Sequence, residues 1–176
     1  MGYLKDERPE TMMVEGDWQV GAYRYKAPRH LEEFCKGLKE KKITGTMCMG
    51  CGKVIVPHRN ICGRCHRRMD ERFVVSNWGT ITCFIVSPPV KRGKFKLFNM
   101  DPVDMGLIKE GEIIVPVFVR FDGSDSNVAT ILYNCKPENV YIGMRVKALW
   151  AKQLNGTLAD LEGVEPLTDE EKGVRP

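Results

Sequence analysis

The sequence predicts a mainly β protein in which an N-terminal helix, a four-cysteine metal ribbon and a small antiparallel barrel follow one another along the chain. Three observations support this fold class. One stretch near residue 35 has helical periodicity, two Cys-x-x-Cys pairs follow it, and the chain then changes to runs of alternating apolar and polar residues. Four or five such runs within about 80 residues, with no helical stretch between them, are typical of a small barrel.

The first 28 residues have no sustained period, yet they are not poor in apolar side chains. Either they fold back on the domain, or they form an arm that packs on another subunit, because a simply disordered segment would contain fewer aromatics. Its apolar residues include Met12, Met13, Val14, Trp18, Tyr23 and Tyr25.

An amphipathic helix is predicted to begin at Pro28. Leu31, Phe34, Cys35 and Leu38 are spaced i, i+3, i+4 and i+7, which places them on one apolar stripe. Lysines at the end of this stretch suit the C-terminal end of a helix dipole. We assign residues 1–43 to the arm and a docking helix.

The four cysteines of the stretch CMGCGKVIVPHRNICGRC are spaced to bind one metal ion. Cys48 and Cys51 form one Cys-x-x-Cys pair, and Cys62 and Cys65 form the other. Four thiolates around a tetrahedral ion leave no position for water or substrate, so the site is structural and not catalytic. We assign residues 44–71 to this ribbon.

Zinc is the favoured metal, although four thiolates also suit iron. Iron would give a rubredoxin-like electron carrier and a red protein. Two histidines, His58 and His66, lie close to the cysteines in sequence. With four thiolates available, we interpret both as surface residues.

Residues 72–153 are predicted to form the barrel. Pro116 falls inside an expected strand and indicates an edge or a bulge, and Cys83 alternates with polar residues as a core residue would. Residues 154–176 are polar, contain Gly and Pro, and are predicted to be a flexible tail. The alternating runs lie within 72–89, 112–121, 128–135 and 144–152.

No catalytic constellation emerges from the sequence. It contains no Gly-rich phosphate loop, no His-Glu-x-x-His motif and no nucleophile elbow. One basic stretch, VKRGKFK, either binds the phosphates of a nucleotide-containing ligand or forms a solvated loop. Its cations are Lys91, Arg92, Lys94 and Lys96.

The charge balance weighs against a nucleic-acid partner. There are 27 Lys and Arg residues against 23 Asp and Glu residues, which gives a formal charge of +4. Four thiolates on a divalent ion would leave about +2. The arginines near the cysteines either offset the charge of the metal site or bind single-stranded nucleic acid, which ribbon and barrel proteins can do. They are Arg59, Arg64, Arg67, Arg68 and Arg72.

The sequence also predicts a cytoplasmic location. No apolar run approaches the roughly 20 residues of a membrane span, and charges at residues 5–8 replace the apolar stretch of a secretory signal. The seven cysteines are an odd number, which argues against a disulfide framework.

Several motifs lie in an order that resembles one known family. The helix and first knuckle read FCKGLKEKKITGTMC and CMGCG, Pro57-His58-Arg59 follows, and CGRC is the second knuckle. The barrel contains NWGT at residues 77–80 and an Ile-Gly-x-x-Val element at residues 142–146. Over residues 29–152 the chain resembles the zinc-ribbon/OB-fold, acyl-CoA-associated family DUF35. Gly63 and Val56 depart from the family pattern, and residues 91–112 match none of it.

The resemblance implies a rubredoxin-like zinc ribbon followed by an OB-fold barrel. It also implies a non-catalytic accessory subunit of a thiolase-type acyl-CoA acyltransferase, whose thiolase-like partner carries the nucleophile and the base. This subunit would support assembly and help to bind coenzyme A or acyl-CoA, with the basic stretch at residues 91–96 near the coenzyme phosphates. The alternative is a single-stranded nucleic-acid-binding protein.

Overall fold

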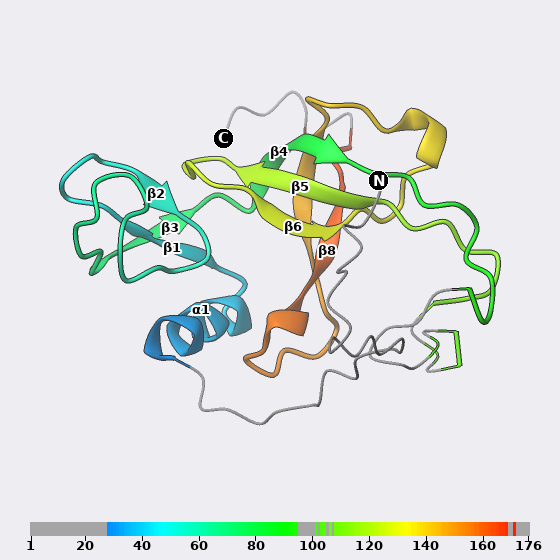
Figure 1. Cartoon of the computed structure of the whole chain (residues 1–176), viewed down its shortest axis with the longest axis horizontal. Coiled ribbons are helices and arrows are strands. Elements are labelled where there is room, and N and C mark those ends of the chain that lie inside the picture. The colour runs from blue at the N-terminus through cyan, green and yellow to red at the C-terminus, as the bar shows by residue number, and fades with distance from the viewer. Residues whose placement is uncertain are drawn as a thin grey trace, which may run out of the picture.

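The computed structural model describes residues 28–94, 101, 103–104, 106, 108–168 and 171, so the predicted N-terminal arm lies outside the described residues. Within them, a helix and a small ribbon sheet lie at one end of the molecule and a curled five-stranded sheet lies beside them (Figure 1). The mainly β fold class is therefore confirmed. The elements are α1 (Arg29–Lys39), β1 (Ile43–Met47), β2 (Val54–Ile55), β3 (Glu71–Val75), β4 (Trp78–Phe84), β5 (Pro116–Phe121), β6 (Val128–Ile131), η1 (Pro137–Asn139), β7 (Arg145–Trp150), η2 (Leu158–Asp160) and β8 (Leu161–Pro166).

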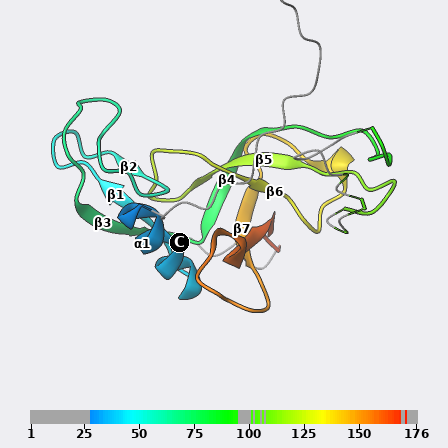
Figure 2. The same cartoon turned by 60° about the horizontal axis from the view of Figure 1, so that its bottom comes forward.

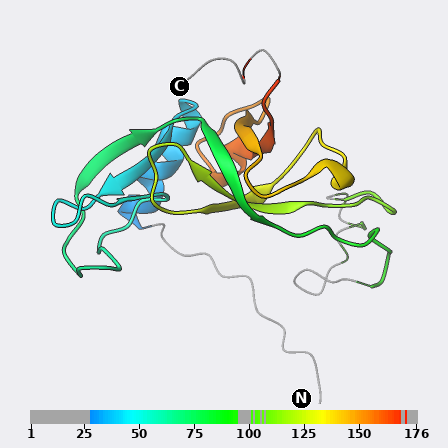
Figure 3. The same cartoon turned by 90° about the horizontal axis from the view of Figure 1, so that it is seen from above.

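Helix α1 has the predicted apolar stripe, and the stripe packs inside the chain. Phe34 and Leu38 are buried against β1 and η2, and η2 lies beside α1 (Figure 3). The outer face is charged and carries ion pairs one turn apart, among them Arg29 with Glu33 at 2.9 Å. We expected a docking helix, but its apolar stripe is covered by the protein's own core. Any contact through α1 must therefore use its charged face.

The ribbon is a three-stranded antiparallel sheet in the order β2-β1-β3. Strand β3 pairs along the whole of β1, from Ile43 opposite Val75 to Met47 opposite Glu71. The prediction that the barrel begins at residue 72 is therefore wrong by a few residues. A period of two identifies a strand but not the sheet that it joins, and the chain enters the barrel only at Trp78.

The second sheet has the order β6-β5-β4-β7-β8 and curls until its two outer strands meet. The N–H of Tyr133, just after β6, donates to the C=O of Val164 in β8 at 2.8 Å. A side chain at Gly163 would meet the C=O of Ile131 at 2.5 Å, so a glycine is needed where the strands approach. The result is the predicted OB-like barrel.

The C-terminal region differs from the flexible tail that the sequence predicted from residue 154, because it contains a strand. Leu161–Pro166 forms β8, which pairs with β7, and Val164 is fully buried. This strand contains a glycine and a proline and has no clear alternation, so its sequence resembles a loop. Its contacts with β7 and β6 stabilise it as a strand.

Two further predictions about the barrel strands are wrong. A bulge between Ile81 and Cys83 turns Ile81 into the core and Cys83 to the surface, so the thiol is not a core residue. Pro116 is neither at an edge nor at a bulge, because β5 lies between β4 and β6. It is the first residue of β5, where the missing N–H is tolerated.

We call the connection between β4 and β5 the β4–β5 loop (residues 85–115), and its two ends run side by side in the part that the structure describes. The N–H of Ser87 donates to the C=O of Ile114 at 3.0 Å, and that of Val90 donates to Glu112 at 2.9 Å. This loop leaves the barrel at the end away from the ribbon (Figure 2). None of the helices that the structure describes is long and apolar enough to cross a membrane.

Candidate metal centre

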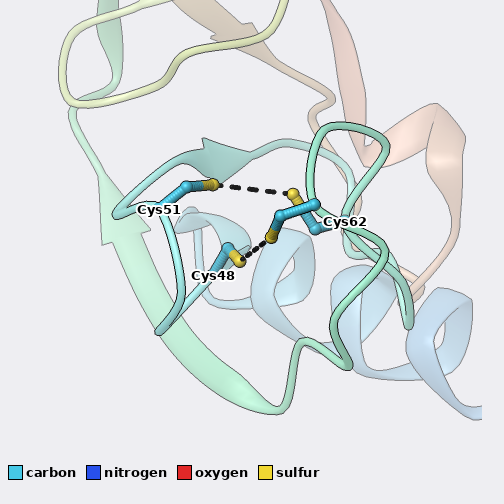
Figure 4. Close-up of side chains that lie close together, drawn as sticks. Cys48, Cys51 and Cys62 are labelled. Carbon is cyan, nitrogen blue, oxygen red and sulfur yellow. Dashed lines mark hydrogen bonds between the residues drawn. The ribbon is translucent and has the colours of Figure 1, made fainter.

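The four cysteines predicted to bind a metal come together at the tip of the ribbon (Figure 4). All four Sγ atoms lie within 4.8 Å of one another. The Cys48 and Cys65 sulfurs are 3.3 Å apart, and those of Cys51 and Cys62 are 3.7 Å apart. Tetrahedral zinc with Zn–S bonds of about 2.3 Å places its sulfurs about 3.8 Å apart. The cluster therefore has the size that a four-thiolate zinc ion requires.

The two knuckles are built alike. In the first, the N–H of Cys48 donates to the C=O of Lys53 at 2.8 Å, and the N–H of Gly52 donates to the C=O of Cys48 at 2.7 Å. The second repeats both bonds around Cys62, with His66 in the place of Gly52. Both of these residues have positive φ, +70° for Gly52 and +56° for His66. In each knuckle the backbone thus turns tightly around one side of the metal position.

The environment of the sulfurs favours binding of a cation. Backbone N–H groups of Cys65 and Arg64 donate to the Cys62 sulfur and lower the pKa of this thiol to about 6. At Cys65 the N–H of Arg67 also favours the thiolate, but the neighbouring Cys48 sulfur and burial outweigh it and raise the pKa to about 11. One thiolate therefore forms readily, whereas complete deprotonation needs a positive ion between the sulfurs.

His58 is not the surface residue that the sequence indicated. It is 4% exposed and lies against Phe34 of α1, with ring centroids 6.1 Å apart. Its Nε2 is 3.0 Å from the Thr44 hydroxyl. Burial lowers the pKa of His58, although Glu33 acts in the opposite direction. His66, the other histidine of the ribbon, is exposed as predicted.

The turn between β5 and β6 fastens the ribbon to the barrel, a role that the sequence did not reveal. The Ser126 hydroxyl accepts from the N–H of Val56 at 2.7 Å and donates to its C=O at 2.8 Å. Asp125 exchanges two bonds with Val54: its backbone N–H donates to the Val54 C=O at 2.8 Å, and its carboxylate accepts the Val54 N–H at 2.9 Å. We call this pair, Asp125 and Ser126, the ribbon latch. The stretch DGSDSN indicates a turn, but not what the turn contacts.

The predicted phosphate-binding cations lie in the β4–β5 loop, and Lys96 lies outside the described residues. Lys91 and Lys94 are exposed, whereas Arg92 pairs with Asp104 at 3.0 Å. The carboxylate of Asp101 accepts the N–H of Gly93 close by. Acidic side chains therefore offset part of the positive charge of this stretch.

The arginines around the ribbon are likewise paired in part. Arg68 contacts Asp70 at 3.0 Å, and Arg72 pairs with Glu33 of α1. These ion pairs reduce the positive charge that a nucleic acid would meet.

An apolar patch covers the outside of the barrel across β4, β5 and β6. Cys83 lies opposite Phe118, Phe118 lies opposite Ala129, and the N–H of Ile85 donates to the C=O of Pro116. Directly paired residues share a face of a sheet, so these side chains form one patch. Ile85 is 65% exposed and Phe118 46% exposed. We call these five residues the outer patch.

The ribbon, the barrel and the four-thiolate cluster define a zinc-ribbon/OB-fold protein, and comparisons with known proteins agree. The model of the ChsH2 rubredoxin-like zinc ribbon domain matches residues 36–70. A DUF35 domain-containing scaffold protein of Methanocaldococcus jannaschii is 27% identical over 126 residues, which cover 70% of this chain and 74% of the relative. These matches confirm the resemblance to the DUF35 family that the motifs predict.

Two solved structures share the fold. One is a DUF35-family protein of unknown function from Sulfolobus solfataricus, with a TM-score of 0.51, 20% identity, and coverage of 69% of this chain and 78% of the other. The second is described as an Ltp2–ChsH2(DUF35) aldolase, with a TM-score of 0.53 and 18% identity. It matches 81% of this chain and 98% of that chain.

Proposed function

We propose that this protein is a non-catalytic accessory subunit of a thiolase-type acyl-CoA acyltransferase complex. The observation that carries the proposal is the joining of a closed four-cysteine ribbon to an OB-like barrel in one chain, whose fold matches 98% of a chain of the Ltp2–ChsH2(DUF35) aldolase. The relative named as a scaffold protein supports a role in assembly. Zinc held by Cys48, Cys51, Cys62 and Cys65 would fix the ribbon and take no part in the reaction.

The outer patch is the surface that best suits the catalytic subunit. Five adjoining exposed apolar side chains on a sheet are unusual for a monomer that meets only water. Aromatic and aliphatic residues at the centre of a contact supply most of its affinity, and Phe118 lies at the centre of this patch. The α1 stripe, in contrast, is already buried.

For the substrate, we propose a 3-oxoacyl-CoA. The complex would cleave a 3-oxoacyl-CoA with coenzyme A, and benzoylsuccinyl-CoA of anaerobic toluene degradation is the first candidate. The exposed Lys91 and Lys94 would lie near the coenzyme phosphates and contribute to binding.

Co-purification and reconstitution with a thiolase-like protein test the proposal. We expect the pair to cleave the 3-oxoacyl-CoA, and the large partner alone to lose most of its activity or its affinity for coenzyme A. Phe118→Asp should weaken association at least about tenfold, because it places a charge at the centre of the contact. Full activity of the large partner alone, with unchanged affinity for coenzyme A, would contradict the proposal.

Val74→Asp is the matched control for association. Val74 is 58% exposed on β3 of the ribbon, outside the outer patch, so the same charge there should leave association within about twofold. For the coenzyme, Lys91→Glu together with Lys94→Glu should raise the KM for coenzyme A and leave assembly unchanged.

A further inference from the structure

A polar pocket of about 200 Å³ lies between the first turn of α1 and the ribbon. Its lining includes His30 and Glu33 from the helix, and His58, Arg68 and Arg72 from the ribbon. The pocket contains none of the four metal-site cysteines and none of the residues of the outer patch.

Two imidazole groups bring unused hydrogen-bonding atoms to this pocket. The Nδ1 atoms of His30 and His58 are buried, and neither has a hydrogen-bond partner among the residues that the structure describes. The His58 side chain is 2% exposed, so water outside the protein cannot satisfy it. A buried polar atom without a partner is unfavourable, which indicates that a bound group satisfies it.

The contacts of His58 are compatible with a donor facing the pocket. Its Nε2 lies 3.0 Å from Thr44 Oγ1 and can accept the hydroxyl hydrogen. The proton of the neutral ring is then on Nδ1, which can donate. The nearest carboxylate oxygen, Glu33 Oε2, is 3.9 Å away, too far for a hydrogen bond.

The charges around the pocket favour an anion. Three arginines and two carboxylates line it, so it is positive even with both histidines neutral. Glu33 Oε1 is occupied by Arg29 at 2.9 Å and by Arg72, which leaves Oε2 as an acceptor. In addition, Pro28 at the start of α1 provides no side-chain cap, and the positive end of the helix dipole favours an anion here.

We propose that this pocket binds a phosphate group that retains a proton. One phosphate oxygen accepts from His58 Nδ1–H, and the phosphate hydroxyl donates to Glu33 Oε2, so the ligand bridges these two groups from the pocket side. Arg72 and Arg68, which also pair with Glu33 and Asp70, supply charge-assisted bonds from the rim. Sulfate has the same shape but no proton at neutral pH, so it meets the Glu33 carboxylate without a donor. The pocket therefore selects phosphate over sulfate.

The three histidines of the chain allow a direct test by NMR. In the zinc-loaded full chain, inorganic phosphate should move the ring signals of His30 and His58 in a saturable way, while the exposed His66 stays unchanged. Sulfate should bind at least about fivefold more weakly, because one hydrogen bond to a charged group is lost. Adenosine 3′-monophosphate distinguishes the two possible sources of the phosphate group. Binding comparable to that of inorganic phosphate indicates an esterified ligand, and much weaker binding indicates free phosphate.

Variants on the rim and at the carboxylate complete the test. Arg72→Gln should weaken phosphate binding about tenfold, whereas Arg64→Gln, which removes the same charge from the ribbon outside this pocket, should change it less than twofold. Glu33→Gln should remove the preference for phosphate, because an amide can donate to sulfate. Melting curves establish that each variant is folded. The proposal is overturned if no saturable shift occurs, if His66 shifts as much as His58, or if sulfate binds as well as phosphate.

Discussion

Asp160 is almost fully buried, yet its carboxylate is well supplied with hydrogen-bond donors. The N–H groups of Asn155 and Gly156 donate to its two oxygens at 3.0 and 2.7 Å, and the Thr157 hydroxyl donates at 3.2 Å. Burial alone would raise the pKa of Asp160, but these donors outweigh it and lower the pKa below its usual range. The charged form therefore holds the loop that precedes β8.

Asp160→Asn should lower the melting temperature at pH 7 by about 5 °C, because an amide accepts these bonds less well than a carboxylate and points its NH₂ group at N–H donors. The folded-state pKa lies below the unfolded value of about 3.9. The stabilisation is thus present above about pH 4 and is lost as the pH falls through the folded-state pKa. Melting curves of both proteins should converge on acidification.

Asp70→Asn is the control for this measurement. Asp70 is exposed and pairs with exposed Arg68, so its replacement should change the melting temperature little at any pH. Equal effects of the two substitutions at pH 7 would show that the donors around Asp160 do not stabilise the loop.

Single residues differ in how far the sequence reveals their roles. The spacing of the four cysteines predicts their cluster, because each knuckle is a local structure that needs only its own few residues. His58 and Asp160 are both buried beside α1, which is distant from them in sequence: His58 lies against Phe34, and η2, which ends at Asp160, packs on the helix. No local pattern marks a polar residue that a distant segment will cover.

At the level of elements, the ribbon latch joins two parts of the molecule through a serine hydroxyl. Ser126→Ala should leave the N–H and C=O of Val56 without their partner and destabilise the protein by about 1–2 kcal/mol. We also expect faster hydrogen exchange at the amides of Val54 and Val56. Chemical unfolding and exchange mass spectrometry measure the two effects.

Ser87→Ala provides a matched control. The Ser87 hydroxyl accepts the N–H of Ile114 at 2.8 Å in the β4–β5 loop, at the far end of the barrel. This variant loses one similar bond, but it should leave exchange at Val54 and Val56 unchanged. Unchanged exchange at those two amides in Ser126→Ala would show that the latch does not hold the ribbon.

The strands were predictable where the alternation of burial is regular. In β5, Val117, Val119 and Phe121 all point into the core as the sequence indicates. In β4 the bulge interrupts the alternation, and in β8 a glycine allows close contact with β6 and at the same time removes the pattern. The bulge and the glycine that shape the barrel thus also interrupt the alternation of apolar and polar residues from which a strand is predicted.

At the scale of the whole molecule, the buried residues form two unequal clusters. The larger runs without interruption from Phe34 and Leu38 of α1, through Ile43 and Val56 at the base of the ribbon, to the barrel. The smaller lies at the ribbon tip and contains Cys48, Cys62 and Met69 as its buried members. Apolar burial therefore stabilises the base of the ribbon together with the barrel, whereas the tip depends on the metal.

Removing the metal should consequently destabilise the ribbon tip and leave the barrel folded. Binding of about 10–16 kcal/mol to a structural zinc site is comparable to the net stability of about 5–15 kcal/mol of a whole domain. With a strong chelator we expect the ribbon tip, residues 48–53 and 60–70, to become sensitive to protease and to exchange its amides, while Val117 and Val119 in the barrel core stay protected.

Cys62→Ser should reproduce the effect of the chelator, because three thiolates and a hydroxyl bind zinc far more weakly. Cys83→Ser is the matched control, since Cys83 is exposed on the barrel, outside the metal centre. Zinc analysis should give one equivalent in Cys83→Ser and a loss in Cys62→Ser. A ribbon tip that stays protease-resistant after complete loss of zinc would contradict this account. It would mean that the hydrogen bonds of the knuckles and the ribbon latch suffice to hold the tip in place.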